Sequence, residues 1–515
     1  MINLRQTLVK FYVIVTLLFM PLYYENGYFN TLDAKSHIFW VASGIVIAVT
    51  IIIAVLEILV EKRTPGPVLA EKGRFSVMDG AILSFGIVAL VSCVLSDYKV
   101  YAFTGSQGWN IGGWTIIALV FTYFFVSRNY TFEKDLWVYS TIACACLYVL
   151  GLLNGLGVDP LGLHAKLADS EMFEYIATIG NINSYSGYLS LSLPLLSMVA
   201  IIDERRWLRN TLYVVLFFGY TNLFTNNSAG GFLGVGVGFC FLIYYCLKDP
   251  SKYRRLLTLG LIFSASCLLM ELAVKFWPIE MVELSDVSLV LTDKLLFVPI
   301  AVVCGVLLLV DIKKHEIFTE RFASIVSKIF AAIVIVAVIA AVAYTATHFS
   351  GKWGTKRGWI WGFAVSVFSA GSIREKLFGV GPDCFGIPVM DMFEEFINEH
   401  WGKRIANAHN EFMQYLVTTG IFGLASYCMM WITSFVEYVK RISWRDEKAP
   451  FFFAIMGYMG QAIVNNPQAL NMATLFLFFG IYRSFDLPHE DPAIIVDDTP
   501  SKGKKKSKKK SGKRR

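Results

Sequence analysis

The sequence predicts an all-helical polytopic membrane protein: a bundle of about 14 (12–14) transmembrane helices with one long extracytoplasmic loop that contains short helices. Of its 515 residues, 56% are hydrophobic and 17% are charged, whereas soluble domains carry roughly 25% charged residues. The mean hydropathy is +0.56. Apolar runs recur along the whole chain, and many approach the ~20 residues that one membrane crossing needs. These observations exclude a soluble enzyme and a disordered chain.

Fourteen apolar runs predict the helices, and the first is interpreted as a retained span. Phe11 to Met20 follows Arg5 and Lys10, as in a signal peptide, but residues 21–25 offer no small-x-small cleavage site. The runs are 8–24, 38–60, 77–96, 114–127, 136–156, 184–202, 211–225, 229–247, 256–276, 294–312, 328–346, 411–438, 451–464 and 469–484. Two pairs are separated only by residues 226–228 and 465–467, so either pair could form a re-entrant hairpin.

The distribution of basic residues predicts the sidedness of the helices. With a cytoplasmic N-terminus, the cytoplasmic connections hold 24 Lys or Arg outside the C-terminal tail, while the outer segments hold 12, seven of them in one long loop. Because short cytoplasmic loops are enriched in basic residues, both termini are predicted to be cytoplasmic. The formal charge of +7 comes from the tail, since residues 501–515 carry ten Lys or Arg and no acid.

The predicted organisation has four parts: membrane helices in 1–346, the outer loop 347–410, membrane helices in 411–486, and a disordered basic tail in 487–515. A loop this long usually carries function. It contains an aromatic stretch suited to the membrane interface, then a glycine turn, then an acidic helical run. The tail could lie along anionic lipids, and without interleaved aromatic residues it gives no support to nucleic-acid binding.

The end of the long loop carries the most informative pattern. His409-Asn410 is followed at fixed spacing by Gly420 and Gly423. This resembles the signature of the bacterial O-antigen ligase and polymerase superfamily. Three other segments are similar to that family's patterns: Arg357 with Trp361 (Arg-x-x-x-Trp), Phe378 to Phe385 (the Gly-x-Gly-Pro-x-x-Phe turn), and Gly180 to Leu195 (the Gly-Asn-x-Asn span entry). The resemblance covers roughly residues 180 to 440.

The resemblance implies a membrane glycosyltransferase in the cytoplasmic (inner) membrane. Its donor would be a glycan linked to a polyprenyl pyrophosphate such as undecaprenyl pyrophosphate, and its acceptor a hydroxyl of a lipid, wall polymer, protein or glycan. Ligases and polymerases share the loop signature, so both remain open. Where many family members have Ser-Arg-Gly, this chain reads Ser228-Ala229-Gly230. An arginine proposed to help hold the lipid pyrophosphate is therefore absent, and another cation or another donor would have to replace it.

Two residues of the loop suit this chemistry by their own properties. A guanidinium makes permanently charged, bidentate contacts with phosphate, which makes Arg357 a candidate catalytic residue; a snorkelling interface arginine is the alternative. A neutral imidazole can accept a proton near pH 7, which makes His409 the candidate general base; a helix cap or surface residue is the alternative. The candidate substrate-binding residues are Lys356, Arg374, Arg404, Asn410, Asn183 and Trp361, with Lys403 adding positive charge.

Other patterns have simpler interpretations. Asp391, Glu394 and Glu395 could hold a divalent cation, but a solvated acidic helix face is preferred, so neither a metal nor a cofactor is predicted. The glycines four residues apart at 230, 234 and 238 predict close helix packing. Asn181 and Asn183 could bind sugar or phosphate, or cap a helix. The alternative function is a lipid-linked glycan flippase or other polysaccharide transporter, although the spans contain almost none of the midplane ionisable groups that ion-coupled transporters use.

Overall fold

The computed structural model describes residues 2–28, 30–60, 75–168, 171, 174–276, 286–292, 295–314, 318–402, 404–441 and 444–487. About 79% of the described residues are helical. The only sheet in the described residues is an antiparallel pair, β1 (Tyr175–Ile176) and β2 (Gly180–Asn181). The predicted all-helical class is confirmed. The basic tail and Lys403 lie outside the described residues.

The helices, in chain order, come from three parts of the chain. The first part of the chain contributes α1 (Ile2–Ile14), a π-helical turn (Val15–Phe19), α2 (Met20–Leu22), α3 (Thr31–Val60), α4 (Val77–Leu95), α5 (Lys99–Thr104), α6 (Gly113–Asn129) and α7 (Leu136–Gly155). The middle contributes α8 (Ile182–Ile202), α9 (Arg206–Thr225), α10 (Ala229–Leu247), α11 (Tyr253–Phe276), α12 (Asp286–Thr292), α13 (Phe297–Lys314) and α14 (Glu320–His348). The last part contributes α15 (Trp353–Ala370), α16 (Ile373–Phe378), α17 (Gly386–His400), α18 (Glu411–Lys440), α19 (Ala449–Ala462) and α20 (Ala469–Ser484).

Several of these helices are suited to a membrane. In the part of the chain that the structure describes, nine are long and apolar enough to cross one: Leu4–Leu22, Thr31–Leu59, Val77–Leu95, Leu136–Gly155, Ile182–Ile202, Ala229–Leu247, Pro250–Phe276, Glu320–His348 and Glu411–Lys440. The other predicted runs also fall on helices, namely α6, α9, α13, α19 and α20. The protein is therefore a helical membrane protein, and fourteen crossings remains a prediction.

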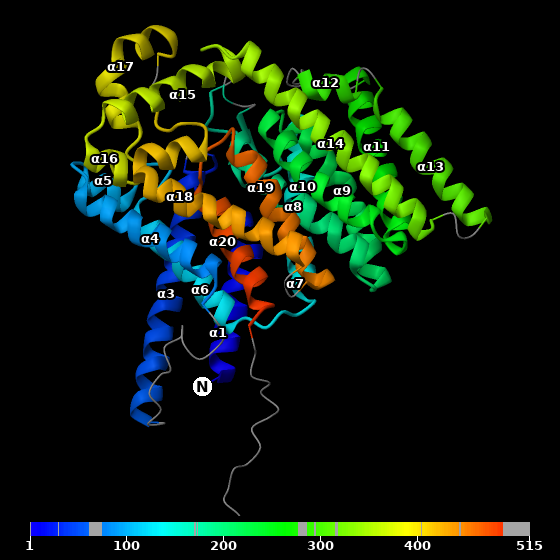
Figure 1. Ribbon diagram of the computed structural model, residues 1–515, viewed down its shortest axis with the longest axis horizontal. Coiled ribbons are helices and arrows are strands. Elements are labelled where there is room, and N and C mark those ends of the chain that lie inside the picture. The colour runs from blue at the N-terminus through cyan, green and yellow to red at the C-terminus, as the bar shows by residue number, and fades with distance from the viewer. Residues whose placement is uncertain are drawn as a thin grey trace, which may run out of the picture.

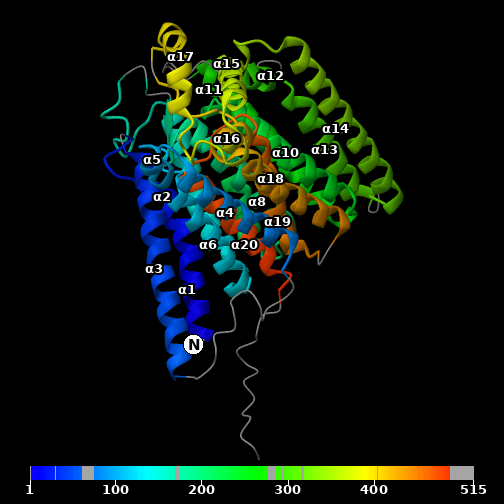
Figure 2. The same ribbon diagram turned by 60° about the vertical axis from the view of Figure 1, so that its left-hand side comes forward.

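The bundle has a buried centre and an exposed flank. In the most apolar stretch of α8, 94% of the residues are buried, and the helix packs against α9, α10 and α19. In the most apolar stretch of α14, only 6% of the residues are buried. Figures 1 and 2 both show α13 and α14 at the side of the molecule, away from α3. The apolar side chains of α14 therefore face the surroundings, as expected of a helix in lipid.

Glycines allow the central helices to approach closely, as predicted. A Cβ at Gly238 of α10 would lie 2.7 Å from Cγ of Pro194 in α8, and one at Gly234 would lie 2.8 Å from Cβ of Gln461 in α19. Small residues at such crossings are the usual basis of tight helix packing in membranes. The central helices α8, α10 and α19 consequently pack closely against one another along their middle sections.

The long loop covers one end of the bundle. Figure 1 shows α15, α16 and α17 together at the end opposite the N-terminus, and Figure 2 shows the same arrangement from another side. The predicted aromatic stretch lies in α15 and the predicted acidic run in α17. These helices share a separate hydrophobic cluster that includes Phe363, Val389, Ile397 and Ile405. The loop is thus a small packed unit.

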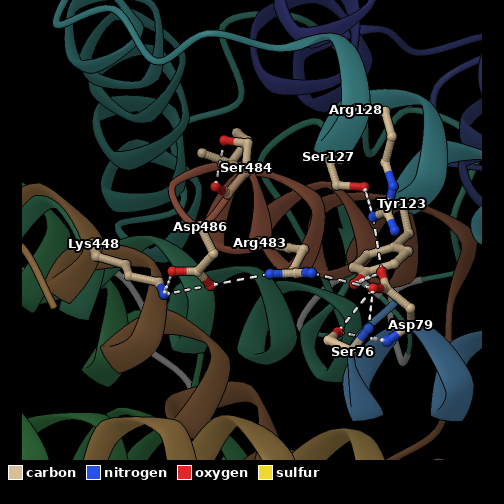
Figure 3. A network of polar contacts seen from close by, with 10 residues as sticks. Ser76, Asp79, Tyr123, Ser127, Arg128, Lys448, Arg483, Ser484 and Asp486 are labelled. Carbon is tan, nitrogen blue, oxygen red and sulfur yellow. Dashed lines mark hydrogen bonds and ion pairs between the residues drawn. The ribbon is translucent and has the colours of Figure 1, made fainter. Parts of the chain in front are cut away.

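A buried charge network lies near the other end of the bundle, where α6 and α20 end (Figure 3). Asp79 of α4 lies 2.8 Å from Arg128 and 3.4 Å from Arg483. Arg483 also lies 3.6 Å from Asp486, whose other partner is Lys448 at 2.8 Å. All five side chains are at least nine-tenths buried. Each cation therefore has a carboxylate partner within the protein.

Candidate functional site

A cavity of about 560 Å³ lies under the long loop and is lined by half of the predicted site residues. Four regions far apart in the sequence form it: the connection between α5 and α6, the β hairpin with the start of α8, the start of α15, and the segment between α17 and α18. Its lining residues are Trp109, Glu174, Asn181, Ile182, Asn183, Thr355, Arg357, Ile360, Trp401, Arg404, Ile405, Ala406, Asn407 and His409. The fold brings the predicted residues Arg357, Arg404, His409 and Asn183 together.

Arg357 enters this cavity from an irregular turn. Gly354, Thr355 and Lys356 have positive φ values of 58°, 56° and 71°, which bends the chain immediately before Arg357. The side chain is half-buried, and burial lowers the pKa of Arg357, although a guanidinium remains charged at all physiological pH values. Among the described residues it has neither a hydrogen-bond partner nor an ion-pair partner. The same holds for Arg404, which is exposed at the cavity.

His409 is held at the cavity by the start of α18. Its φ of 47° is left-handed, which is uncommon outside glycine. Asn410 caps the helix by accepting a hydrogen bond from the backbone N–H of Met413 at 3.0 Å, and the backbone N–H of Ala408 donates to the side chain of Gln414 at 2.9 Å. The imidazole Nδ1 lies 3.3 Å from the amide nitrogen of Asn466. The histidine is therefore fixed on both sides by neighbours in the chain and oriented by a distant amide.

Gly420, the first of the two glycines that follow His409, determines how the loop packs on α18. Gly420 has φ 70° and ψ −169°, which interrupts the helix. The carbonyls of Val417 and Thr418 then accept hydrogen bonds from the backbone N–H groups of Val380 and Gly381, both at 3.0 Å. A Cβ at Gly420 would collide with the carbonyl of Leu377. Gly420 therefore allows the Gly-x-Gly-Pro turn to dock onto the helix that follows His409.

The same turn carries a buried carboxylate, Asp383. It accepts hydrogen bonds from the backbone N–H groups of Ser106 at 2.8 Å and Ile111 at 3.2 Å. Burial raises the pKa of Asp383 to about 6, and these two hydrogen bonds oppose the shift. Asp383 thereby ties the connection between α5 and α6, which includes Trp109, to the long loop.

The asparagines at the start of α8 are fixed by the protein itself. Asn181 caps α8 by accepting from the backbone N–H of Asn183 at 2.9 Å, so the capping interpretation is confirmed for Asn181. The side chain of Asn465 donates to the carbonyl of Asn183 at 2.8 Å, and Ser228 lies 3.4 Å from the Asn183 side-chain oxygen. Ala229, which stands where the family pattern has arginine, follows Ser228 directly. Arg357 and Arg404 are the cations that line the cavity instead.

Three predicted substrate-binding residues are not part of the cavity lining, and their side chains contact other protein groups. Lys356 donates to the carbonyl of His400 at 2.6 Å and lies over the ring of Trp401. Arg374 forms an ion pair with Asp97 at 2.7 Å, which raises the pKa of Arg374 and lowers that of Asp97. Trp361 packs in an aromatic group with Phe349 and Trp353. Asn410, the fourth residue outside the lining, is the α18 cap.

Sequence reasoning missed Asn466, Trp109 and Glu174. Asn466 lies in the tight connection between α19 and α20, and its contact with His409 joins residues 57 positions apart. Glu174, beside the β hairpin, is the one acidic residue among the described residues that line the cavity. For Asn466, the only signal in the sequence was Asn465-Asn466-Pro467, because asparagines in a tight turn between two spans often hydrogen-bond nearby backbone.

The charged residues that line the cavity determine which ligands it favours. Two arginines and a histidine face a single carboxylate, so the cavity favours an anion. In the described part of the chain, no three His, Cys, Asp or Glu side chains gather as metal ligands would. Comparison with known proteins adds no identity: no family model matches the chain, and no curated protein matches its sequence.

Proposed function

We propose that the protein is a membrane glycosyltransferase that uses no metal and transfers or polymerises a glycan linked to polyprenyl pyrophosphate at the outer face of the cytoplasmic membrane. The observation that carries this proposal is the cavity that contains both His409 and an Arg357 without a protein partner among the described residues. The resemblance of the loop motifs to the O-antigen ligase and polymerase superfamily, and the positive-inside distribution, support the same conclusion.

The arginines would hold the leaving group. Arg357 and Arg404 line the cavity without carboxylate partners in the described structure, so each can donate hydrogen bonds to phosphate oxygens. Guanidinium–phosphate contacts are charge-assisted and often bidentate. As the bond between the anomeric carbon and the phosphate oxygen breaks, negative charge grows on the pyrophosphate. Fixed cations at that position stabilise the transition state more than the ground state.

His409 would take the proton from the acceptor hydroxyl. The acceptor oxygen attacks the anomeric carbon, a new glycosidic bond forms, and the polyprenyl pyrophosphate leaves with the electron pair of the broken bond. The amide of Asn466 can present either its oxygen or its nitrogen to Nδ1 of His409, and its oxygen has no other hydrogen-bond partner among the described residues. With that oxygen accepting from Nδ1–H, Nε2 is the basic nitrogen of the ring.

The test measures glycan transfer in isolated membranes at matched protein levels. General-base catalysis contributes about 10²- to 10⁴-fold, so His409→Gln is expected to reduce transfer by about that factor. Arg357→Ala is expected to reduce it by about 10²- to 10³-fold, the usual loss for one group that stabilises an oxyanion. His348→Gln is the matched control, because His348 is exposed and lies outside the cavity lining.

Two outcomes would contradict the proposal. One is wild-type transfer by both His409→Gln and Arg357→Ala. The other comes from cells that lack the protein: lipid-linked glycan stranded on the cytoplasmic leaflet would indicate a flippase, whereas material stranded on the outer leaflet agrees with transfer. Shortened surface glycans would indicate a polymerase, and full-length chains left on the carrier would indicate a ligase.

A further inference from the structure

We call the cavity that contains Arg357, Arg404 and His409 the cationic cavity. A second, larger concavity lies between α3, α5 and α6. Its volume is about 830 Å³. It begins at the α15–α17 end of the bundle near Glu25 and extends along α3 past Gly44 to Ile47. At 1.5 Å per helical residue, the path from Thr31 to Ile47 is roughly 24 Å long. We call it the α3 groove.

The α3 groove changes character along its length. Its mouth is lined by Glu25, Asp33, His37 and Gln107, and its inner part by apolar or small residues such as Ile47 and Ala118. His37 and Gln107 are exposed and make no hydrogen bond to another described residue. A ligand that matched these walls would be an amphiphile with a hydroxyl-rich head and an apolar tail.

Aromatic rings line the groove between its polar mouth and apolar interior. Trp40, Tyr101 and Trp114 contribute them, and Tyr101 and Trp114 are 55% and 58% exposed. The indole N–H of Trp40 donates to Thr115 at 2.9 Å, which fixes that ring. Rings with one apolar face and a polar edge suit ligands that are part apolar and part polar, and they gather at membrane interfaces.

The charge of the α3 groove is opposite to that of the cationic cavity. Glu25 and Asp33 are its charged lining residues, and no Lys or Arg lies among the described residues that line it. Two carboxylates disfavour a phosphate-bearing head group. The groove and the cavity therefore select ligands of different chemistry.

One short connection forms a wall of both sites. Between α5 and α6, Trp109 lines the cationic cavity while Gln107 and Asn110 line the α3 groove. Asp33 accepts hydrogen bonds from the backbone N–H of Gly108 at 3.1 Å and the side chain of Asn110 at 2.5 Å. The connection is therefore fixed from the groove side by Asp33 and from the loop side by Asp383. A molecule in the α3 groove would lie one chain segment away from the cavity.

We infer that the α3 groove binds a glycolipid whose sugar head group carries no phosphate, and that this lipid is the acceptor substrate. The inference that it is an acceptor rests on the proposed function; the binding of the glycolipid does not. The acidic mouth and aromatic rings take the uncharged sugar, and the apolar wall along α3 takes the acyl chain. The free hydroxyls of the head group point to the segment shared with the cavity that contains His409.

The test is photo-crosslinking in phosphatidylcholine nanodiscs. The labelled peptides are identified by mass spectrometry after proteolysis. One probe is a diglucosyl diacylglycerol that carries a diazirine in its acyl chain, and the comparison probe is a phosphatidylglycerol with the same chain. The diglucosyl probe is expected to label α3, α5 and α6 about tenfold more than the phosphatidylglycerol probe does.

Glycine substitutions provide a matched pair of variants. A Cβ at Gly44, in the groove, meets nothing within 4 Å, and the same is true of Gly236 on an exposed position of α10. Gly44→Phe therefore fills part of the groove without a clash at Cβ. Because its ring would occupy space that the lipid needs, it is expected to reduce labelling by the diglucosyl probe about tenfold. Gly236→Phe is expected to retain wild-type labelling.

Equal labelling by both probes would identify an ordinary lipid-facing surface and overturn the inference, as would unchanged labelling in Gly44→Phe. Arg357→Ala separates this inference from the proposed function, because it is expected to lose transfer while retaining the diglucosyl label. If labelling behaves as expected and the His409 and Arg357 variants transfer normally, the groove binds glycolipid and the proposed transfer chemistry is wrong.

Discussion

The two ends of the bundle both contain partly or fully buried cations, but these cations differ in whether they contact carboxylates. Near the N-terminal end, Arg128, Arg483 and Lys448 contact the carboxylates of Asp79 and Asp486 (Figure 3). Under the long loop, Arg357 and Arg404 line a cavity without carboxylate partners among the described residues. Both arrangements require desolvation of a guanidinium or ammonium group, which is costly unless a partner compensates it.

The difference separates a structural role from a binding role. The charge network joins the ends of α4, α6, α19 and α20, and each of its cations contacts a carboxylate within the fold. Among the described residues, Arg357 and Arg404 contact no carboxylate, which suits an anionic ligand that supplies the missing charge. Removal of a residue should therefore affect folding at the network and ligand binding at the cavity. The following predictions test that division.

The largest expected effect is on stability, from Asp79→Ala. This change leaves Arg128 and Arg483 buried without their shared carboxylate, and breaking one partner of a buried ion pair costs about 3–5 kcal/mol. Thermal unfolding in detergent is expected to occur at a markedly lower temperature. Asp79→Asn retains hydrogen bonding to Tyr123 and should lose less. An unchanged unfolding temperature for Asp79→Ala would show that the network is not structural.

A smaller effect is expected from Asp383, as a dependence of stability on pH. Burial raises its pKa to about 6, so the folded chain binds this proton more tightly than the unfolded chain does. Its contribution to stability is complete below about pH 4 and is lost as the pH rises from about 4 to 6. Asp383→Asn keeps an oxygen acceptor for Ser106 and Ile111, so its unfolding temperature should decline less over this range.

Unfolding curves of wild type and Asp383→Asn between pH 4 and 8 check this expectation. Asp97→Asn is the control, because Asp97 is exposed in the same region and its pKa is lowered by Arg374. Identical pH profiles for wild type and Asp383→Asn would contradict the assignment of the raised pKa to this carboxylate.

The smallest expected effect is that of Arg374→Ala. The pair with Asp97 lies on the surface, and such pairs contribute little because water screens them. No resolvable change is expected in unfolding temperature or in glycan transfer. A loss of transfer comparable to that of Arg357→Ala would show that Arg374 belongs to the site, as the sequence predicted.

The fold was largely predictable because its signals are local. Apolar runs located the helices, and the glycines at 230, 234 and 238 located a close crossing. The break of α18 at Gly420 was not predictable from hydropathy, because the surrounding run is apolar throughout. It depends on backbone hydrogen bonds from Val380 and Gly381, which are distant in the sequence.

The candidate site was predictable only where motif spacing marked it. His409, Arg357, Arg404 and Asn183 were expected to act together, and they line one cavity. Lys356 and Arg374 had the right charge, but neighbouring groups occupy their side chains. Asn466, Trp109 and Glu174 come from connections between helices that only the tertiary fold brings to the site, and composition and spacing do not encode that arrangement.

The most direct test of the division between the two ends is the affinity of the purified protein for undecaprenyl pyrophosphate in nanodiscs. A hydrogen bond to a charged group contributes about 1.5–3 kcal/mol, so Arg357→Ala is expected to weaken binding by about 10- to 150-fold. Its unfolding temperature without ligand should stay near that of wild type, and Arg374→Ala should bind normally. Equal affinities of wild type and Arg357→Ala would contradict the assignment of the cavity as the pyrophosphate site.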